Sequence, residues 1–219
     1  MTAHEIAALP DLPADLPGLV RIETSDRQAT TPIIMDMLRS VYPHDQVFGK
    51  YCTVNEYIDC PPDEVFRYLS DTRSLEEWTY SLRGFTPTDD PGLWLAYDRL
   101  GDTTEIYTRT VAHADARTVD YHCAWDQGKH LWMVYVMRVM DARTVLDVEG
   151  SVVLWTNCRH PFYDENPYPE TAPTDRVPWV GDFWDMFAAG HRLEMSNLKA
   201  ICEYRWANDL PVTPNWMSE

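Results

Sequence analysis

Apolar and polar positions alternate most regularly in the segment that begins at residue 51. Residues 51–58 are rich in β-branched and aromatic side chains, a composition that suits a pleated, half-buried strand. Four apolar or thiol side chains share one parity and are expected to face inward: Cys52, Val54, Ile58 and Cys60. Pro61 and Pro62 cannot donate to a ladder, so the strand is predicted to end there.

Two short helices are predicted directly after the prolines. Proline is favoured in a first helical turn, where Asp63 and Glu64 also complement the helix dipole. Three apolar side chains then fall on one face: Val65, Phe66 and Leu69. Ser74 and Glu77 have the spacing of a capping box, which predicts a second helix ending at Trp78.

The stretch after Trp78 predicts an antiparallel meander. Segments rich in β-branched and aromatic residues alternate there with short turns rich in Gly, Asp and Ala. The predicted strands are residues 93–100, 105–112, 118–125, 131–140 and 144–156. Because such short turns join neighbouring strands, we expect consecutive strands to pair with each other.

A long helix, residues 179–206, is predicted to close the domain. Its apolar side chains gather on one side, and with them lies one histidine: Trp184, Phe187, His191, Met195, Leu198 and Cys202. The loop before it, residues 158–178, holds five prolines and three aromatic residues. Its aromatic content predicts an ordered lid, with a disordered linker as the alternative.

The chain divides into one domain with appendages. Residues 1–48 are predicted to form an N-terminal extension, an extended arm followed by a short helix near residues 26–41. The extension is expected to cover an opening or to mediate self-association as a homodimer. Residues 49–208 form the main domain, and residues 209–219 are a proline-marked tail.

Composition and charge exclude several classes of function. The 219 residues carry a formal net charge of −17, which argues against nucleic-acid and anionic-membrane partners because both need clustered basic residues. The sequence contains no run long and apolar enough to span a membrane and no secretory signal. Its five cysteines are scattered, so reduced thiols and a cytoplasmic location are expected.

One segment carries a family resemblance. It is the run Ile58-Asp59-Cys60-Pro61-Pro62-Asp63-Glu64-Val65-Phe66, followed by Leu69-Ser70-Asp71 and then by Trp78. This run resembles the opening of the START-like superfamily, also called SRPBCC or Bet v 1-like, which includes polyketide cyclases and dehydrases. The resemblance covers about residues 51–206. It implies an α+β helix-grip fold, in which a curved antiparallel sheet and two short helices surround a C-terminal helix and a deep apolar cavity.

Three residues are candidates for acid–base chemistry. His191 lies in the middle of the apolar stripe, where it would act as a general acid or base, or else would be a hydrogen-bonded core histidine. Glu56 shares the inward parity of the first strand, where burial would raise its pKa; the alternative is a solvated or ion-paired carboxylate. Arg109 is a candidate partner of Glu56 and a candidate oxyanion stabiliser.

Aromatic side chains are expected to form the walls of the cavity. On the strands the candidates for substrate contacts are Trp94, Tyr107, Trp125, Tyr135 and Trp155, and on the closing helix they are Trp184, Phe187 and Met195. Tyrosine and tryptophan combine flat apolar area with a polar tip, which suits a planar, oxygenated ligand. No motif specifies a metal or a nucleotide, so neither a metal nor an organic cofactor is expected.

Three functions remain open on the sequence. The resemblance implies a hydrophobic small-molecule ligand and suggests an enzyme that cyclises, aromatises or dehydrates poly-β-keto chains by acid–base chemistry. The alternative is a carrier or sequestering protein for a hydrophobic metabolite, and a third option is a protein-partner module. Converging ionisable groups in the cavity would favour the enzyme. A wholly apolar cavity would favour the carrier, and a large exposed apolar patch the partner module.

Overall fold

The computed structural model describes residues 11–13, 16–19, 21, 28, 32, 36, 51–99, 104–158, 165, 167–171 and 184–218. At residues 184–189 the description covers the backbone. Residues 100–103, 159–164 and 172–183 lie outside it, as does most of the segment before residue 51. The predicted helix near residues 26–41 is represented by Gln28, Pro32 and Asp36, which have helical backbone conformation. Self-association through the extension stays a prediction.

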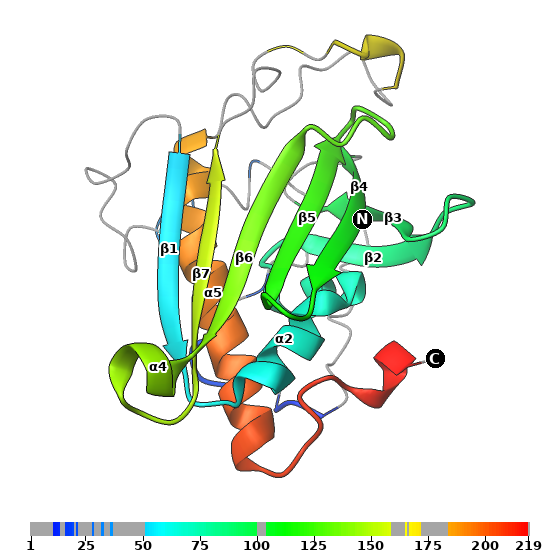
Figure 1. Ribbon diagram of the computed structural model, residues 1–219. Helices are drawn as coiled ribbons and strands as arrows, with labels where there is room; N and C mark the ends of the chain where they lie inside the picture. The colour runs from blue at the N-terminus through cyan, green and yellow to red at the C-terminus, as the bar shows by residue number, and fades with distance from the viewer. Residues whose placement is uncertain are drawn as a thin grey trace.

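A seven-stranded antiparallel sheet forms one layer of the fold (Figure 1). Its strands are β1 (Tyr51–Ile58), β2 (Leu82–Pro87), β3 (Leu93–Asp98), β4 (Thr104–His113), β5 (Thr118–Trp125), β6 (Met133–Asp141) and β7 (Ser151–Cys158). The strand order is β1-β7-β6-β5-β4-β3-β2. Six strands thus follow one another as a meander, and β1 pairs at the far edge with β7.

Helices cover one face of this sheet. The long helix α5 (Trp184–Ala207) runs behind β1 and β7, and α2 (Pro62–Ser70) crosses below β5 and β6 in the view of Figure 1. A 3₁₀ turn, η2 (Thr72–Ser74), joins α2 to the single-turn helix α3 (Leu75–Trp78). The predicted order of strand, two short helices, meander and closing helix is therefore confirmed.

Local sequence explains the start of this arrangement. Pro61 is the N-cap of α2, and Asp63 and Glu64 lie in its first turn. The inward parity of β1 is also confirmed, because Cys52, Val54, Ile58 and Cys60 are all buried. The capping box predicted from Ser74 and Glu77 is wrong. The Ser74 side chain makes no capping hydrogen bond, and the carboxylate of Glu77 is buried against Arg205.

Two strand predictions need correction. Residues 82–87 form β2, which the strand pattern does not predict, and a register shift between Arg83 and Thr86 interrupts its pairing with β3. Residues 142–146 form the short helix α4 (Ala142–Leu146) instead of the start of a strand. The side chain of Asp141 caps α4 by accepting a hydrogen bond from the Arg143 backbone N–H, and β7 begins only at Ser151.

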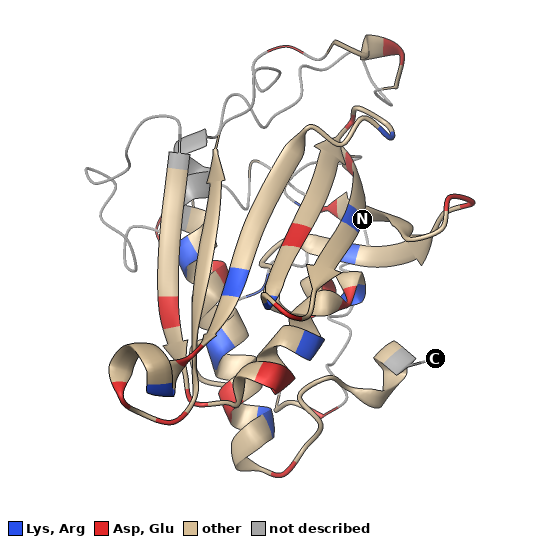
Figure 2. Cartoon of the chain, in the orientation of Figure 1, with Lys and Arg blue, Asp and Glu red and all other residues tan. Residues whose placement is uncertain are grey.

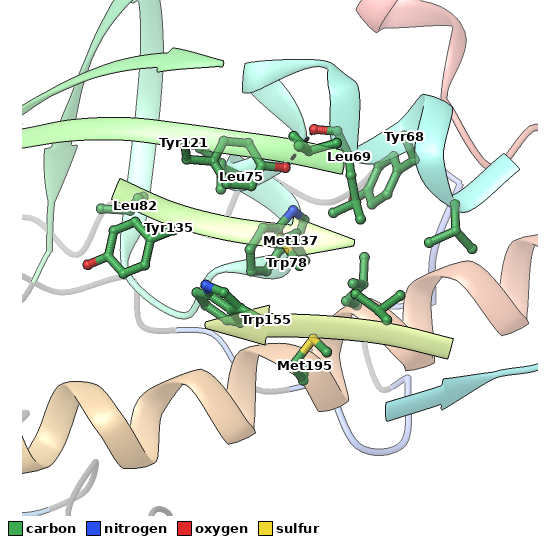
Figure 3. Close-up of a cluster of buried hydrophobic side chains, with 14 of the residues drawn as sticks. Tyr68, Leu69, Leu75, Trp78, Leu82, Tyr121, Tyr135, Met137, Trp155 and Met195 are labelled. Carbon is green, nitrogen blue, oxygen red and sulfur yellow. Dashed lines mark hydrogen bonds between the residues drawn. The ribbon is translucent and has the colours of Figure 1, made fainter. Parts of the chain in front are cut away.

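The core lies between the sheet and the helices. Figure 3 shows its centre, where Trp78 and Leu75 from α3 meet Tyr121, Met137 and Trp155 from the sheet. The terminal segments contribute as well: Leu12 packs against the core, and Val212 and Met217 are buried in it. The tail beyond residue 208 is therefore an integral part of the packing.

Charged side chains lie along the helices α2 and α5, on several strands and in the turns (Figure 2). Figure 2 shows acidic residues at the β2–β3 turn and in the segment between α4 and β7. Within the described ranges, no helix combines the length and apolar character that crossing a membrane requires.

Candidate ligand pocket

A pocket lies between the inner face of the sheet, the segment after α3 and the helix α5. The lining residues come from α3 and the following segment (Leu75, Trp78, Thr79, Tyr80, Ser81, Leu82), from the sheet (Asp98, Ile106, Tyr121, Cys123, Trp125, Tyr135, Trp155) and from α5 (His191, Glu194). Its volume is about 40 Å³, which is room for a few water molecules. This pocket is therefore much smaller than the deep cavity implied by the resemblance.

Aromatic rings account for the small volume. Trp155 makes an edge-to-face contact with Trp78, at a centroid distance of 5.4 Å, and a second with Tyr135 at 5.9 Å. Trp125 makes a third edge-to-face contact, with Tyr135, at 6.3 Å. These are the separations preferred by aromatic pairs, so the rings stabilise one another in the closed arrangement.

His191 and Glu194 place an ionisable pair at this aromatic wall. Both side chains are buried, and Nδ1 of His191 lies 3.3 Å from Oε2 of Glu194. The imidazole packs on the indole of Trp155, with the ring centroids 4.1 Å apart, and edge-on against Tyr135 at 5.3 Å. Since the two residues are three apart on α5, the helix itself sets their separation.

Burial determines the protonation of Glu194. Loss of hydration raises the pKa of its carboxyl group, and the hydrogen bond from His191 opposes part of this rise. The backbone N–H of Tyr80 donates to Oε1 of Glu194 at 3.3 Å. The carboxyl group is thus held in place from both sides and retains its proton to a higher pH than an exposed glutamate.

Two further polar residues border the pocket. Asp98, at the end of β3, accepts a hydrogen bond of 3.0 Å from the indole Nε1 of Trp125. The phenol of Tyr80 has a pKa well above its usual value, because it is buried and because Glu194 and Asp98 add negative charge nearby. Tyr80 therefore stays a neutral hydroxyl throughout the physiological pH range.

Gly190 explains how Tyr80 comes so close to α5. A Cβ atom at position 190 would lie 2.7 Å from Cε1 of Tyr80 and 3.0 Å from its hydroxyl oxygen. A glycine inside a helix lowers helix stability, so its presence one residue before His191 reflects this contact. The same glycine therefore brings the segment after α3 against the ionisable pair.

Four of the predicted site residues meet in this pocket: Trp125, Tyr135, Trp155 and His191. Met195 is fully buried in the core but lies outside the pocket lining. The side chains of Trp184 and Phe187 fall outside the described residues.

The structure places the other four elsewhere. Arg109 is exposed and Tyr107 half-buried on β4, whose buried positions are Thr104, Ile106 and Thr108, so both side chains lie on the opposite face of the sheet. Trp94 lies beneath the guanidinium of Arg73, 5.5 Å from ring centroid to Cζ. Glu56 pairs with Arg192 of α5 at 3.0 Å rather than with Arg109.

Sequence reasoning missed three polar pocket residues. Glu194 lies at the edge of the apolar stripe of the closing helix, and its i, i+3 spacing from His191 was a usable signal. Asp98 shares the parity of buried Ala96, which was a second such signal. Tyr80 gave no periodic signal, because it lies in a connecting segment. The position of that segment depends on contacts with residues distant in sequence.

The described residues also bear on whether the protein could bind a metal ion. No group of three or more His, Cys, Asp or Glu side chains is arranged there to hold a metal ion.

The described part of the proline-rich loop contacts the β5–β6 turn: Tyr168 stacks on His130 at 3.4 Å, and the Thr171 hydroxyl donates to the Asp126 carbonyl. This packing favours an ordered loop over a linker at those residues.

Comparison with solved structures finds several proteins to which this chain is distantly similar. ZhuI aromatase/cyclase from Streptomyces sp. R1128 is 14% identical, with a TM-score of 0.48, over 71% of this chain and 94% of that one. A START superfamily protein from Mycobacterium smegmatis is 11% identical, with a TM-score of 0.42, over 73% and 99%. A protein from Thermus thermophilus is 12% identical, with a TM-score of 0.47, over 73% and 98%.

No family model and no curated protein matches the sequence. The order of helices and strands in the structure itself determines the fold class. Two short helices follow β1, and a long C-terminal helix packs on a seven-stranded antiparallel sheet. The chain has the helix-grip α+β fold that the START-like resemblance implies.

Proposed function

We propose that this protein binds a hydrophobic, oxygen-bearing small molecule in the pocket beside α5 and transforms it by acid–base chemistry. The observation that carries the proposal is the buried pair of His191 and Glu194, in which the imidazole of His191 packs on the indole of Trp155. Converging ionisable groups in a largely aromatic pocket are the feature that favours an enzyme over a passive carrier.

The pair can hold a proton in two ways. When Glu194 is ionised, it accepts the Nδ1–H of His191, which leaves Nε2 with a lone pair and makes it a base. When Glu194 is protonated, it donates to Nδ1, and Nε2 then carries the hydrogen and is an acid. Because burial raises the pKa of Glu194, the second form extends to higher pH than it would in water.

The reaction class that fits is enolisation followed by loss of water, as in the aromatisation or cyclisation of a poly-β-keto chain. Nε2 removes a proton from the carbon next to a ketone. The electron pair expels a hydroxyl group from the neighbouring carbon, and the protonated imidazole returns its proton to that group, which leaves as water. Atoms and charge balance without a cofactor.

A ligand of this kind requires the pocket to open. Ligand pockets commonly measure about 300–1,000 Å³, several times the volume enclosed here. The rings of Trp155, Tyr135 and Trp78 that fill the space would have to separate, and their flat faces would then hold the ligand. Enclosure and orientation by such walls supply much of the rate in intramolecular condensations.

Native mass spectrometry of the protein purified from its producing cell tests the proposal. We expect a bound small molecule that the wild type converts during incubation and that His191→Ala leaves unchanged. A ligand that the wild type also leaves unchanged would establish the carrier function instead. His122→Ala is the matched control, because His122 lies on the opposite parity of β5 from the buried Tyr121 and Cys123.

A further inference from the structure

The inner face of β7 carries two polar side chains whose hydrogen-bonding groups are not used within the described part of the protein. They are Trp155 and Asn157, about 4% and 5% exposed. The indole Nε1 of Trp155 and both polar atoms of the Asn157 carboxamide are buried and make no hydrogen bond there. Buried polar groups in folded proteins are nearly always paired, so this cluster calls for an explanation.

The side chains of Trp155 and Asn157 are neighbours on the inner face of β7. Residues two apart on a strand point to the same face, so Asn157 continues the inner row that begins with Val153 and Trp155. Trp155 lines the pocket and contacts His191, whereas Asn157 lies one inward position further along, at the end of β7. In Figure 3 the indole nitrogen of Trp155 lies on the side of Tyr135.

The side chain next to Asn157 on strand β1 is uncharged. Its partner in the β1–β7 register is Cys52, whose thiol has its pKa raised to about 11 by burial and therefore stays protonated. A neutral carboxamide with two N–H donors and one acceptor, next to an indole N–H donor, is suited to an uncharged oxygen function. A carboxylate ligand would find no cation in this pair.

From this geometry we infer that Trp155 and Asn157 form a polar subsite for the carbonyl oxygen of the ligand. The inference rests on the proposed function and specifies its substrate as an uncharged, carbonyl-bearing molecule. The oxygen accepts hydrogen bonds from Nε1 of Trp155 and Nδ2 of Asn157, while Oδ1 of Asn157 is left to accept from a neighbouring hydroxyl. These contacts hold the ketone beside the imidazole of His191, so Asn157 is a specificity-determining residue.

A pair of isosteric probes tests the subsite. The planar ketone 2-acetonaphthone and the hydrocarbon 2-isopropenylnaphthalene have the same shape, but a CH₂ group replaces the carbonyl oxygen in the second. Titration calorimetry on the full chain should show that the wild type prefers the ketone by about five- to tenfold, the ratio for a net hydrogen bond of ordinary strength. Asn157→Leu, similar in volume, should lose this preference and keep its affinity for the hydrocarbon.

A thermal melt of the same variant provides a second readout. Asn157→Leu removes unused buried polar atoms, so we expect its melting temperature to rise by about 2–4 °C while ketone binding falls. Val153→Leu, on the same inner row, is the control for altered packing. If Asn157→Leu retained the full preference for the ketone, the subsite would be refuted while the proposed function stood. If the wild type bound neither probe, the proposed function would fail as well.

Discussion

Arg205 and Glu77 form a two-pronged ion pair in which both side chains are completely buried. Nη1 and Nη2 of Arg205 lie 2.7 and 2.9 Å from the two carboxylate oxygens of Glu77, and the Tyr68 hydroxyl donates to the same carboxylate at 2.6 Å. The pair joins the end of α5 to α3. It therefore fixes the angle at which the long helix crosses the two short helices.

Removing the guanidinium from this pair should destabilise the fold strongly. Arg205→Met leaves the Glu77 carboxylate buried without its cation, so we expect unfolding free energy to fall by about 3–5 kcal/mol in urea titrations. The exposed pair of Arg67 and Glu64 is the control, and Arg67→Met should cost no more than about 1 kcal/mol. Equal losses in the two variants would show that burial of the first pair is unimportant.

The N-terminal segment should share in this stability. Asp11 makes a second two-pronged contact with Arg205, with both distances 2.9 Å. Asp11→Ala should therefore cost about 1.5–3 kcal/mol, the range for a hydrogen bond to a charged group. In a double-mutant cycle, Asp11→Ala should have little further effect once Arg205 is Met. Full additivity would mean that the contact contributes nothing.

Gly190 offers a test of the packing around the pocket. Alanine normally stabilises a helix relative to glycine, but here its Cβ would overlap the ring of Tyr80. We expect Gly190→Ala to lower the free energy of unfolding by about 1–3 kcal/mol, the usual cost of overpacking. In a Tyr80→Ala background the same change should be neutral or stabilising. A stabilised single variant would contradict the close approach.

Glu194 should make stability depend on pH. Burial raises the pKa of its carboxyl group above the usual 4.5, so the folded state binds more protons than the unfolded state between those two values. The free energy of unfolding then falls as pH rises through that window, and the favourable contribution is complete below it. Glu194→Gln does not titrate. Its stability relative to wild type should accordingly increase from acid to neutral pH, whereas a constant difference in urea titrations would argue against the raised pKa.

The fold was well predicted from the sequence because its signals there are local. The prolines at 61 and 62 set the strand-to-helix transition. The inward parity of Cys52, Val54 and Ile58 on β1 was predicted correctly because a buried strand alternates strictly. The exposed aliphatic side chains Val145 and Leu146 suggested a strand where the structure has α4. A short apolar segment that is not buried does not by its composition distinguish a helix from a strand.

Only about half of the pocket residues could be predicted, because a residue's place in the pocket depends on which face of the sheet it lies on and on tertiary contacts. On β4 the bulky residues Tyr107 and Arg109 lie on the face away from the pocket, and small threonines face inward. Residue size thus pointed to the wrong parity. His191 could be found from the helical period, but Tyr80 and Asp98 reach the pocket through packing between segments distant in sequence, to which no periodic pattern is sensitive.

Proton exchange at a ketone measures directly whether His191 and Glu194 move a proton in this pocket. Exchange of the methyl protons of 2-acetonaphthone in D₂O can be followed by NMR with wild type, His191→Ala and the control His122→Ala. We expect the wild type and the control to accelerate exchange, and His191→Ala to lose about 10²-fold or more of this acceleration. Exchange that His191→Ala catalyses as fast as the wild type would show that His191 does not transfer the proton.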